Sequence, residues 1–176
     1  MLYYFELLVS RLFRKMWLKN QLVLLEDECA RLKNLCTQFA KVSRVHDIFL
    51  LDKDGQIIVN EGESKHIDVT ALASLVAGNV AAIGGLAHLI DEDEFPVQFH
   101  QGSRESIHIS LVGERLILML IFDQRSSLGL VQLKLKKIHR EILDLIEQID
   151  FKSNERSPSV FSEITDEDID DFFSDH

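Results

Sequence analysis

The side chains that could act as acids, bases or nucleophiles are scattered through this sequence. His88, His100 and His108 have no Ser, Cys or carboxylate partner at a spacing that indicates a catalytic dyad or triad. In the alternating segment SIHISLV, His108 falls on the opposite side from its isoleucine neighbours, so we expect it at the solvent or at an interface. The motifs GxSxG, GxGxxG and GxxxxGK followed by Ser or Thr do not occur. We therefore predict that the protein is not an enzyme and has no active site of its own.

Three arginines are candidates for an arginine finger, a cation that some proteins insert into the site of a GTPase. They are Arg104, Arg115 and Arg125. Each has an ordinary explanation as a charge at a strand edge or in a loop. Arg125, in the loop DQRSS, is the best candidate of the three, but the pattern does not favour this role.

The two cysteines, Cys29 and Cys36, lie two turns apart on one predicted helix, about 10 Å along its axis, and cannot form a disulfide there. No CxxC or Cys/His spacing indicates a zinc site. Free thiols are typical of a reducing cytosol. We expect no metal and no cofactor.

The stretch 68–90, DVTALASLVAGNVAAIGGLAHLI, predicts a helix with two apolar faces of different size, with Asp68 or Thr70 as its N-cap. We expect the face of large residues to pack on the core. Its members are Leu72, Leu75, Val76, Ile83, Leu86 and Ile90. The opposite face carries small or uncharged residues, namely Thr70, Ser74, Ala77, Ala81, Gly84, Gly85 and His88.

Two adjacent glycines inside a helix cost roughly 1 kcal/mol each relative to alanine, so an interaction must offset them. We interpret the small residues as a contact strip for a partner, made of Ala77, Gly78, Ala81, Gly84, Gly85 and His88. An alternative is a helix buried on both sides within its own domain. A membrane span is disfavoured because Asn79 and His88 interrupt the stretch and acidic residues flank both ends.

The remaining patterns place this helix in one domain, residues 21–150. An amphipathic helix is expected over 21–41, strands over 44–51 and 56–60, three more over 97–101, 106–112 and 115–122, and a long helix from 128 to about 150. The fold class is α+β. We predict a five-stranded antiparallel sheet in three layers, with the crossover helix on one face and the two terminal helices on the other.

Both ends of the chain lie outside that domain. Residues 1–20 form an N-terminal extension, and either an amphipathic membrane-surface helix or a true start at Met16 would explain them. Residues 151–176 combine a linker with an acidic segment, FSEITDEDIDDFF, whose apolar residues share one side of a short predicted helix. We interpret this segment as a docking helix for a partner.

Charge excludes one class of partner. The formal net charge is −10, and the acidic C-terminal segment supplies most of it. Nucleic-acid binding would need a concentrated basic stripe, which the sequence lacks.

The segment 68–137 resembles the roadblock domain of the dynein light chain relatives. The most specific parts are LASLVAGNVAA, GGLAHLI, EFPVQFH and FDQRSSLGLV, and the similarity extends over about 21–173. Within the family, the likeness is to bacterial regulators of motility. The resemblance implies a three-layer fold and a cytoplasmic homodimer, located in part at a cell pole. Membrane contact is expected only if residues 1–15 belong to the protein.

The resemblance also implies a function. Such proteins act as GTPase-activating proteins for a GTP-bound, Ras-like small GTPase that controls cell polarity and gliding motility. They shift the GTPase's own switch elements and insert no arginine finger. The alternative within the family is a non-catalytic adaptor or scaffold.

Several positions match partner contacts of the family. On the central helix these are Ala81 and Gly85. In the C-terminal segment, a second contact surface that favours nucleotide exchange would fall on Ile164, Ile169, Phe172 and Phe173. Arg31, Lys136 and Lys137 match family positions near the partner and are weaker candidates.

Overall fold

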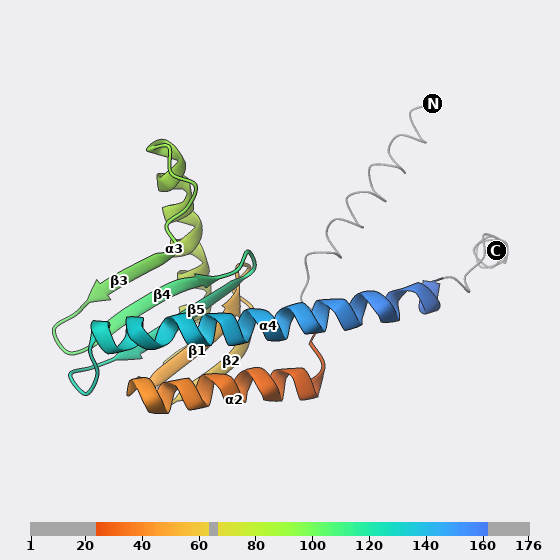
Figure 1. The fold of residues 1–176 in the computed structure, drawn as a ribbon. Helices are drawn as coiled ribbons and strands as arrows, with labels where there is room; N and C mark the ends of the chain where they lie inside the picture. Colours follow the sequence, from red (N-terminus) through yellow and green to blue (C-terminus); the bar gives the residue numbers. More distant parts are fainter. Residues whose placement is uncertain (1–23, 64–66, 162–176) are drawn as a thin grey trace, which may run out of the picture.

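The computed structural model describes residues 24–63 and 67–161, with side chains as far as Lys152. Its elements follow the predicted order of helix, two strands, helix, three strands and helix (Figure 1). They are α2 (Glu26–Ser43), β1 (Asp47–Asp52), β2 (Ile57–Gly62), α3 (Val69–Leu89), β3 (Val97–Gln101), β4 (Ser106–Val112), β5 (Leu116–Phe122) and α4 (Leu128–Phe161).

The five strands form one antiparallel sheet in the order β2-β1-β5-β4-β3. β5 lies at the centre, where Met119 pairs with Phe49 of β1 on one side and with Ile109 of β4 on the other. Every residue of β5 is buried, which confirms that its continuous apolar run marks a strand covered on both faces. β3 pairs only with β4 among the described strands, so its outer edge is open.

The two faces of the sheet have separate cores. Along β5, Leu118 and Leu120 point toward α2 and α4, whereas Ile117 and Met119 point toward α3. The larger core lies under α2 and α4, and the smaller one lies under α3. The predicted three-layer arrangement is confirmed (Figure 1).

Local signals set the ends of the helices. Asp68 caps α3, because its Oδ1 accepts a hydrogen bond from the backbone N–H of Ala71 at 3.0 Å. α2 ends at Arg44, whose left-handed φ of 57° turns the chain toward β1. α4 continues to Phe161, beyond the predicted helix end at about residue 150 and into the polar stretch that was interpreted as a linker. The polar composition of that stretch does not prevent α4 from continuing.

The prediction that the large residues of α3 form its core face is wrong for half of them. Leu75 is 72% exposed and Leu86 is 48% exposed, and Ile90 is exposed as well. Leu72 and Ile83 are half-buried, and only Val76 is fully buried. The buried positions are instead Ala73, Val76, Ala77 and Ala87. Ala73 and Ala77 lie against Gly55 of the β1–β2 turn, and Ala73 and Val76 pack with sheet residues in the smaller core.

The expectation for His108 is also wrong. Its side chain is 0% exposed and lies on the α4 side of the sheet, in register with Phe99 and Leu120. Neither ring nitrogen has a hydrogen-bond partner. Nearby, Ser110 Oγ lies 2.9 Å from Nε2 of His139 on α4. Because α4 covers this face of β4, the polar side of the strand is not a solvent side.

Candidate partner-binding surface

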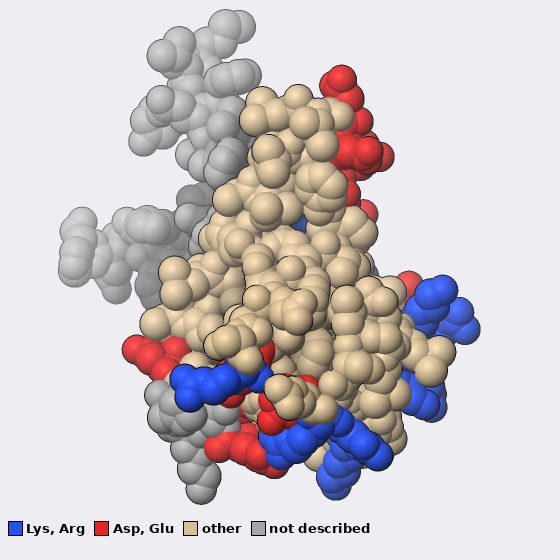
Figure 2. All heavy atoms as spheres, turned by 90° about the vertical axis from the view of Figure 1, so that its left-hand side faces the viewer, with Lys and Arg blue, Asp and Glu red and all other residues tan. Residues whose placement is uncertain are grey.

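The outward face of α3 is an exposed strip of small residues, formed by Gly78, Ala81, Ala82 and Gly85, with His88 beside it. α3 carries no Asp, Glu, Lys or Arg from Val69 to Leu89. Figure 2 shows the projecting part of the molecule, formed by α3, as largely uncharged, with acidic side chains along one edge. The loop after α3 supplies acidic residues there, Asp91 to Glu94, all of them exposed.

Nothing within the chain requires glycine at the three glycine positions of α3. A Cβ built on Gly78 or Gly85 of the strip, or on the neighbouring Gly84, would meet no heavy atom within 4 Å. Alanine would therefore fit at each position and would favour the helix by roughly 1 kcal/mol. The absence of these Cβ atoms leaves a flat surface on which another backbone can lie closely.

The strip is narrower than predicted. Ala77 is 9% exposed and packs against Gly55 of the β1–β2 turn, so it belongs to the core face of α3. Gly84 is half-buried. Among the predicted residues, Gly78, Ala81, Gly85 and His88 remain exposed, although Gly78 also lines the hollow described next.

A second feature adjoins the strip, an apolar hollow of about 560 Å³ between α3 and the strands at the open edge of the sheet. Its residues are Leu72, Ser74, Leu75, Val76, Gly78, Asn79, His100, Ile107, Ile109 and Met119. Leu86, 48% exposed, lies on the same side of α3 as Leu75 and Asn79. Sequence reasoning missed this hollow because it assigned the leucines to the core.

The other predicted contact residues do not join this surface. Arg31 is exposed on α2, where its Nη2 lies 3.4 Å from Oε1 of Gln148 on α4. Lys136 and Lys137 are exposed on α4, and Lys137 Nζ lies 3.6 Å from Oε1 of Glu141. α2 and α4 form the opposite layer from α3. The C-terminal candidates Ile164, Ile169, Phe172 and Phe173 lie outside the described residues, as does the whole of 1–23.

Arg125 does not project freely. Its Nε lies 3.0 Å from Oδ2 of Asp123, and its Nη2 lies 3.6 Å from Oε2 of Glu63. The backbone N–H and guanidinium of Arg125 lower the pKa of the Asp123 carboxyl, and Asp123 in turn raises the pKa of Arg125. The side chain remains 57% exposed, so these contacts orient it without burying it.

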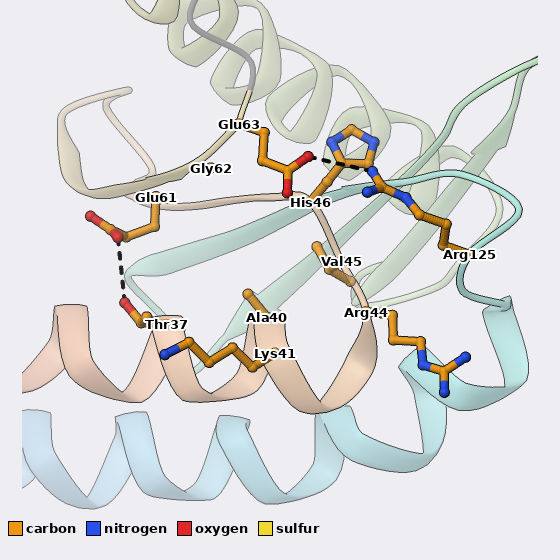
Figure 3. A pocket seen from close by; sticks show the side chains of 10 residues that line it. All are labelled: Thr37, Ala40, Lys41, Arg44, Val45, His46, Glu61, Gly62, Glu63 and Arg125. Atoms are coloured by element: carbon orange, nitrogen blue, oxygen red, sulfur yellow. Dashed lines mark hydrogen bonds and ion pairs between the residues drawn. The ribbon is translucent and has the colours of Figure 1, made fainter.

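A polar pocket of about 420 Å³ lies beside Arg125, where α2 ends and β2 leaves the sheet (Figure 3). Ala40 and Val45 line it together with charged groups of both signs, including Lys41, Arg44 and Glu61. Glu61 is already held by Lys33 Nζ at 2.8 Å and lies 3.5 Å from Thr37 Oγ1. This balance of charges favours neither an anion nor a cation as ligand.

The described residues include no group of three or more His, Cys, Asp or Glu that could hold a metal ion. α3 is long and apolar enough to cross a membrane by length and composition. However, α3 connects two strands of one sheet and packs on that sheet through Ala73 and Val76. Its exposed apolar face therefore fits a protein partner better than lipid.

A domain with an open sheet edge and an uncharged, exposed helix is organised to contact other proteins, as a regulator or an adaptor does. The chain belongs to the Roadblock/LC7 domain family, whose sequence pattern matches residues 31–122.

Solved structures of MglB proteins are similar to the whole domain. The MglB of Myxococcus xanthus shares 47% sequence identity with this chain, with a TM-score of 0.68 over 73% of this chain and 96% of that chain. The gliding protein MglB of Thermus thermophilus shares 29% identity, with a TM-score of 0.68 over 73% and 97%. A structure described as MglB with a tetrameric arrangement shares 28% identity at the same TM-score of 0.68, over 73% and 97%. No curated protein sequence matches the chain.

Proposed function

We propose that this chain is a homodimeric regulator of a Ras-like small GTPase of the MglA type, and that it stimulates hydrolysis of the bound GTP. The observation that carries the proposal is the exposed strip of Gly78, Ala81 and Gly85 on α3. No contact within the chain requires glycine at Gly78 or Gly85. A flat, uncharged helix face fits a globular partner that must approach closely.

The activation would work through the switch elements of the GTPase. α3 has no arginine to insert, and the guanidinium of Arg125 is engaged by Asp123 and Glu63. A regulator without a catalytic group can accelerate hydrolysis by binding the competent switch arrangement more tightly than the resting one, which shifts the population. Each tenfold shift corresponds to about 1.4 kcal/mol of differential affinity.

Two features support the homodimer. The outer edge of β3 has no partner strand among the described residues, and large apolar side chains, Leu75 and Leu86 among them, are exposed beside it. A second copy that presents the same edge and the same helix would cover both. The similarity to a tetrameric MglB agrees with self-association.

One relative is named a gliding protein, which supports a role for this chain in gliding motility. We further propose that it acts in the control of cell polarity, in the cytoplasm and at a cell pole. The acidic C-terminal segment would contact the GTPase at a second surface and favour nucleotide exchange.

A single-turnover assay tests the main proposal. The cognate MglA-type GTPase is loaded with GTP, and hydrolysis is followed with and without an excess of this protein. We expect an acceleration of at least about tenfold that saturates with the concentration of the regulator. Measurable binding without any change in the rate would reject activation and identify the protein as an adaptor.

A further inference from the structure

The side of α4 that points away from the sheet carries a regular row of exposed residues. The buried residues Val131, Leu135 and Ile142 mark the side that packs on the core. Opposite them, exposed positions recur at alternating spacings of four and three, so they share one face over about 27 Å of helix. This outer row of α4 consists of Leu133, Lys137, Arg140, Asp144, Glu147 and Phe151. It lies in the layer opposite α3 (Figure 1).

The outer row is complementary to its own reverse. Its two ends are large apolar side chains, Leu133 at 72% exposed and Phe151 at 65% exposed. Between them, two basic positions are followed by two acidic ones. When two copies of the row lie antiparallel and centred on each other, each basic position therefore faces an acidic one. The facing pairs are Leu133 with Phe151, Lys137 with Glu147, and Arg140 with Asp144, and each pair forms twice.

Contacts within the chain do not explain this order of charges. Lys137 Nζ lies 3.6 Å from Oε1 of Glu141, but the Lys137 side chain remains 80% exposed. A lysine that precedes a glutamate by four residues is also the less favourable orientation for a helical ion pair. Arg140 and Asp144, which have the same spacing, form no ion pair within the part of the chain that the structure describes. These charged groups are therefore available to a partner.

We propose that the outer row of α4 binds a second copy of this chain, with the two α4 helices antiparallel around a two-fold axis near position 142. A two-fold interface brings the same patch of both copies together, so it requires a self-complementary surface. The apolar pairs at the ends would lose their exposure to water. The charged pairs between them would contribute orientation and specificity more than affinity.

This contact goes beyond the proposed function, because it does not use α3 or the open edge of β3. It lies on the other side of the sheet and leaves the strip on α3 free for a GTPase. If the homodimer also forms through the α3 side, the contact through α4 links one dimer to another.

Charge reversal at the centre of the outer row tests the proposal, with association followed by sedimentation equilibrium of the full chain without any GTPase. Arg140→Asp places two acidic groups opposite each other, and Asp144→Arg places two basic groups opposite each other. Each variant alone should associate through α4 at least about tenfold more weakly than the wild type.

An equimolar mixture of the two variants should restore association to within about threefold of the wild type, because every facing pair is again complementary. A change confined to one chain cannot produce this rescue. Lys53→Asp and Glu114→Arg are matched controls that change the net charge by the same amounts at exposed turn positions. Alone or mixed, they should alter association less than about twofold.

The outcomes do not depend on the homodimer of the proposed function. If that homodimer forms, the single variants remain dimers and the wild type assembles further; if it does not, the single variants are monomers and the wild type dimerises. Undiminished association in the single variants would overturn the proposal, and so would a mixture that associates no better than its components. A wild type without any species larger than those of the single variants would overturn it as well. Circular dichroism melts confirm that each variant is folded.

Discussion

Gly55 and Ala77 lie in contact where α3 crosses the β1–β2 turn, and a Cβ on Gly55 would stand 3.5 Å from the Cβ of Ala77. It would also stand 3.4 Å from the carbonyl oxygen of Ala73. Gly55 has a φ of 86°, which side chains other than glycine rarely adopt. The turn therefore fixes where α3 lies on the sheet, and with it which face of α3 points outward.

Replacing Gly55 by alanine should destabilise the fold. The added Cβ would make only ordinary contacts, so the cost comes from the strained φ, which should lower the free energy of unfolding by about 1 to 2 kcal/mol. Urea denaturation followed by circular dichroism measures this. A variant as stable as the wild type would show that α3 does not depend on this contact.

Gly85→Ala should have the opposite effect on stability. Its Cβ would meet open space, so the gain in helix propensity should raise the free energy of unfolding by about 0.5 to 1 kcal/mol. The same methyl group should weaken binding of the GTPase, because it separates the two surfaces. Urea denaturation measures the expected increase in stability, and a binding assay measures the expected loss of affinity for the GTPase. A variant that is more stable but binds the GTPase with normal affinity would place the partner elsewhere.

The double variant Ala81→Arg with Gly85→Arg should abolish the stimulation of GTP hydrolysis while the dimer still forms. Both positions are exposed, so two long side chains block the strip without entering the core. Single-turnover hydrolysis and sedimentation report the two properties separately. Gln132→Arg on α4 serves as the matched control. Undiminished stimulation in the double variant would reject the contact assignment.

His108→Leu should stabilise the protein and flatten its response to acid. Burial, followed by the neighbouring His139, lowers the pKa of His108 from 6.5 to about 4. The unfolded chain therefore takes up the proton first as the pH falls. The neutral imidazole makes its full contribution to the free energy of unfolding above about pH 6.5. Between that pH and about pH 4 the free energy of unfolding falls by about 1.4 kcal/mol per pH unit.

In the wild type, the free energy of unfolding should thus fall between about pH 7 and pH 5, and His108→Leu should remove most of this decrease. The free energy of unfolding of the variant should also be about 1 kcal/mol higher than that of the wild type at neutral pH, because the substitution removes ring nitrogens without hydrogen bonds from the core. Urea denaturation at both values of pH measures the effect. His139, whose pKa burial also lowers, accounts for any decrease that remains. An equally steep response in the variant would exclude His108 as its source.

Deletion of residues 162–176 should separate two activities. The strip on α3 remains intact, so the stimulation of hydrolysis should persist, while the promotion of nucleotide exchange should weaken. Release of a fluorescent GDP analogue from the GTPase measures exchange. Equal loss of both activities would mean that the C-terminal segment belongs to the main interface.

The fold could be predicted from the sequence because its signals are local. Alternation over 106–112 and the apolar run before Phe122 specify strands by side-chain period alone. Which side of α3 packs on the rest of the domain could not be predicted this way. A helix that packs through Ala73 and Ala77 has the same periodicity as one that packs through its leucines, and only the contact with Gly55 decides between them.

The exposure of part of the candidate strip could be predicted for the same reason. The absence of charge along α3 predicts a contact face, which remains a prediction, and Ala81 and Gly85 are exposed there. The burial of His108 depends on where α4 crosses β4, a long-range contact that strand alternation does not encode.

In the proposed homodimer, a second copy would cover Leu75 and Leu86, which are exposed in the single chain. Association would then stabilise the folded state by mass action, so the melting temperature should rise with protein concentration. In a cell, the concentration of the protein and its lifetime would then be coupled, because at low concentration the chains would be monomeric and more susceptible to proteases.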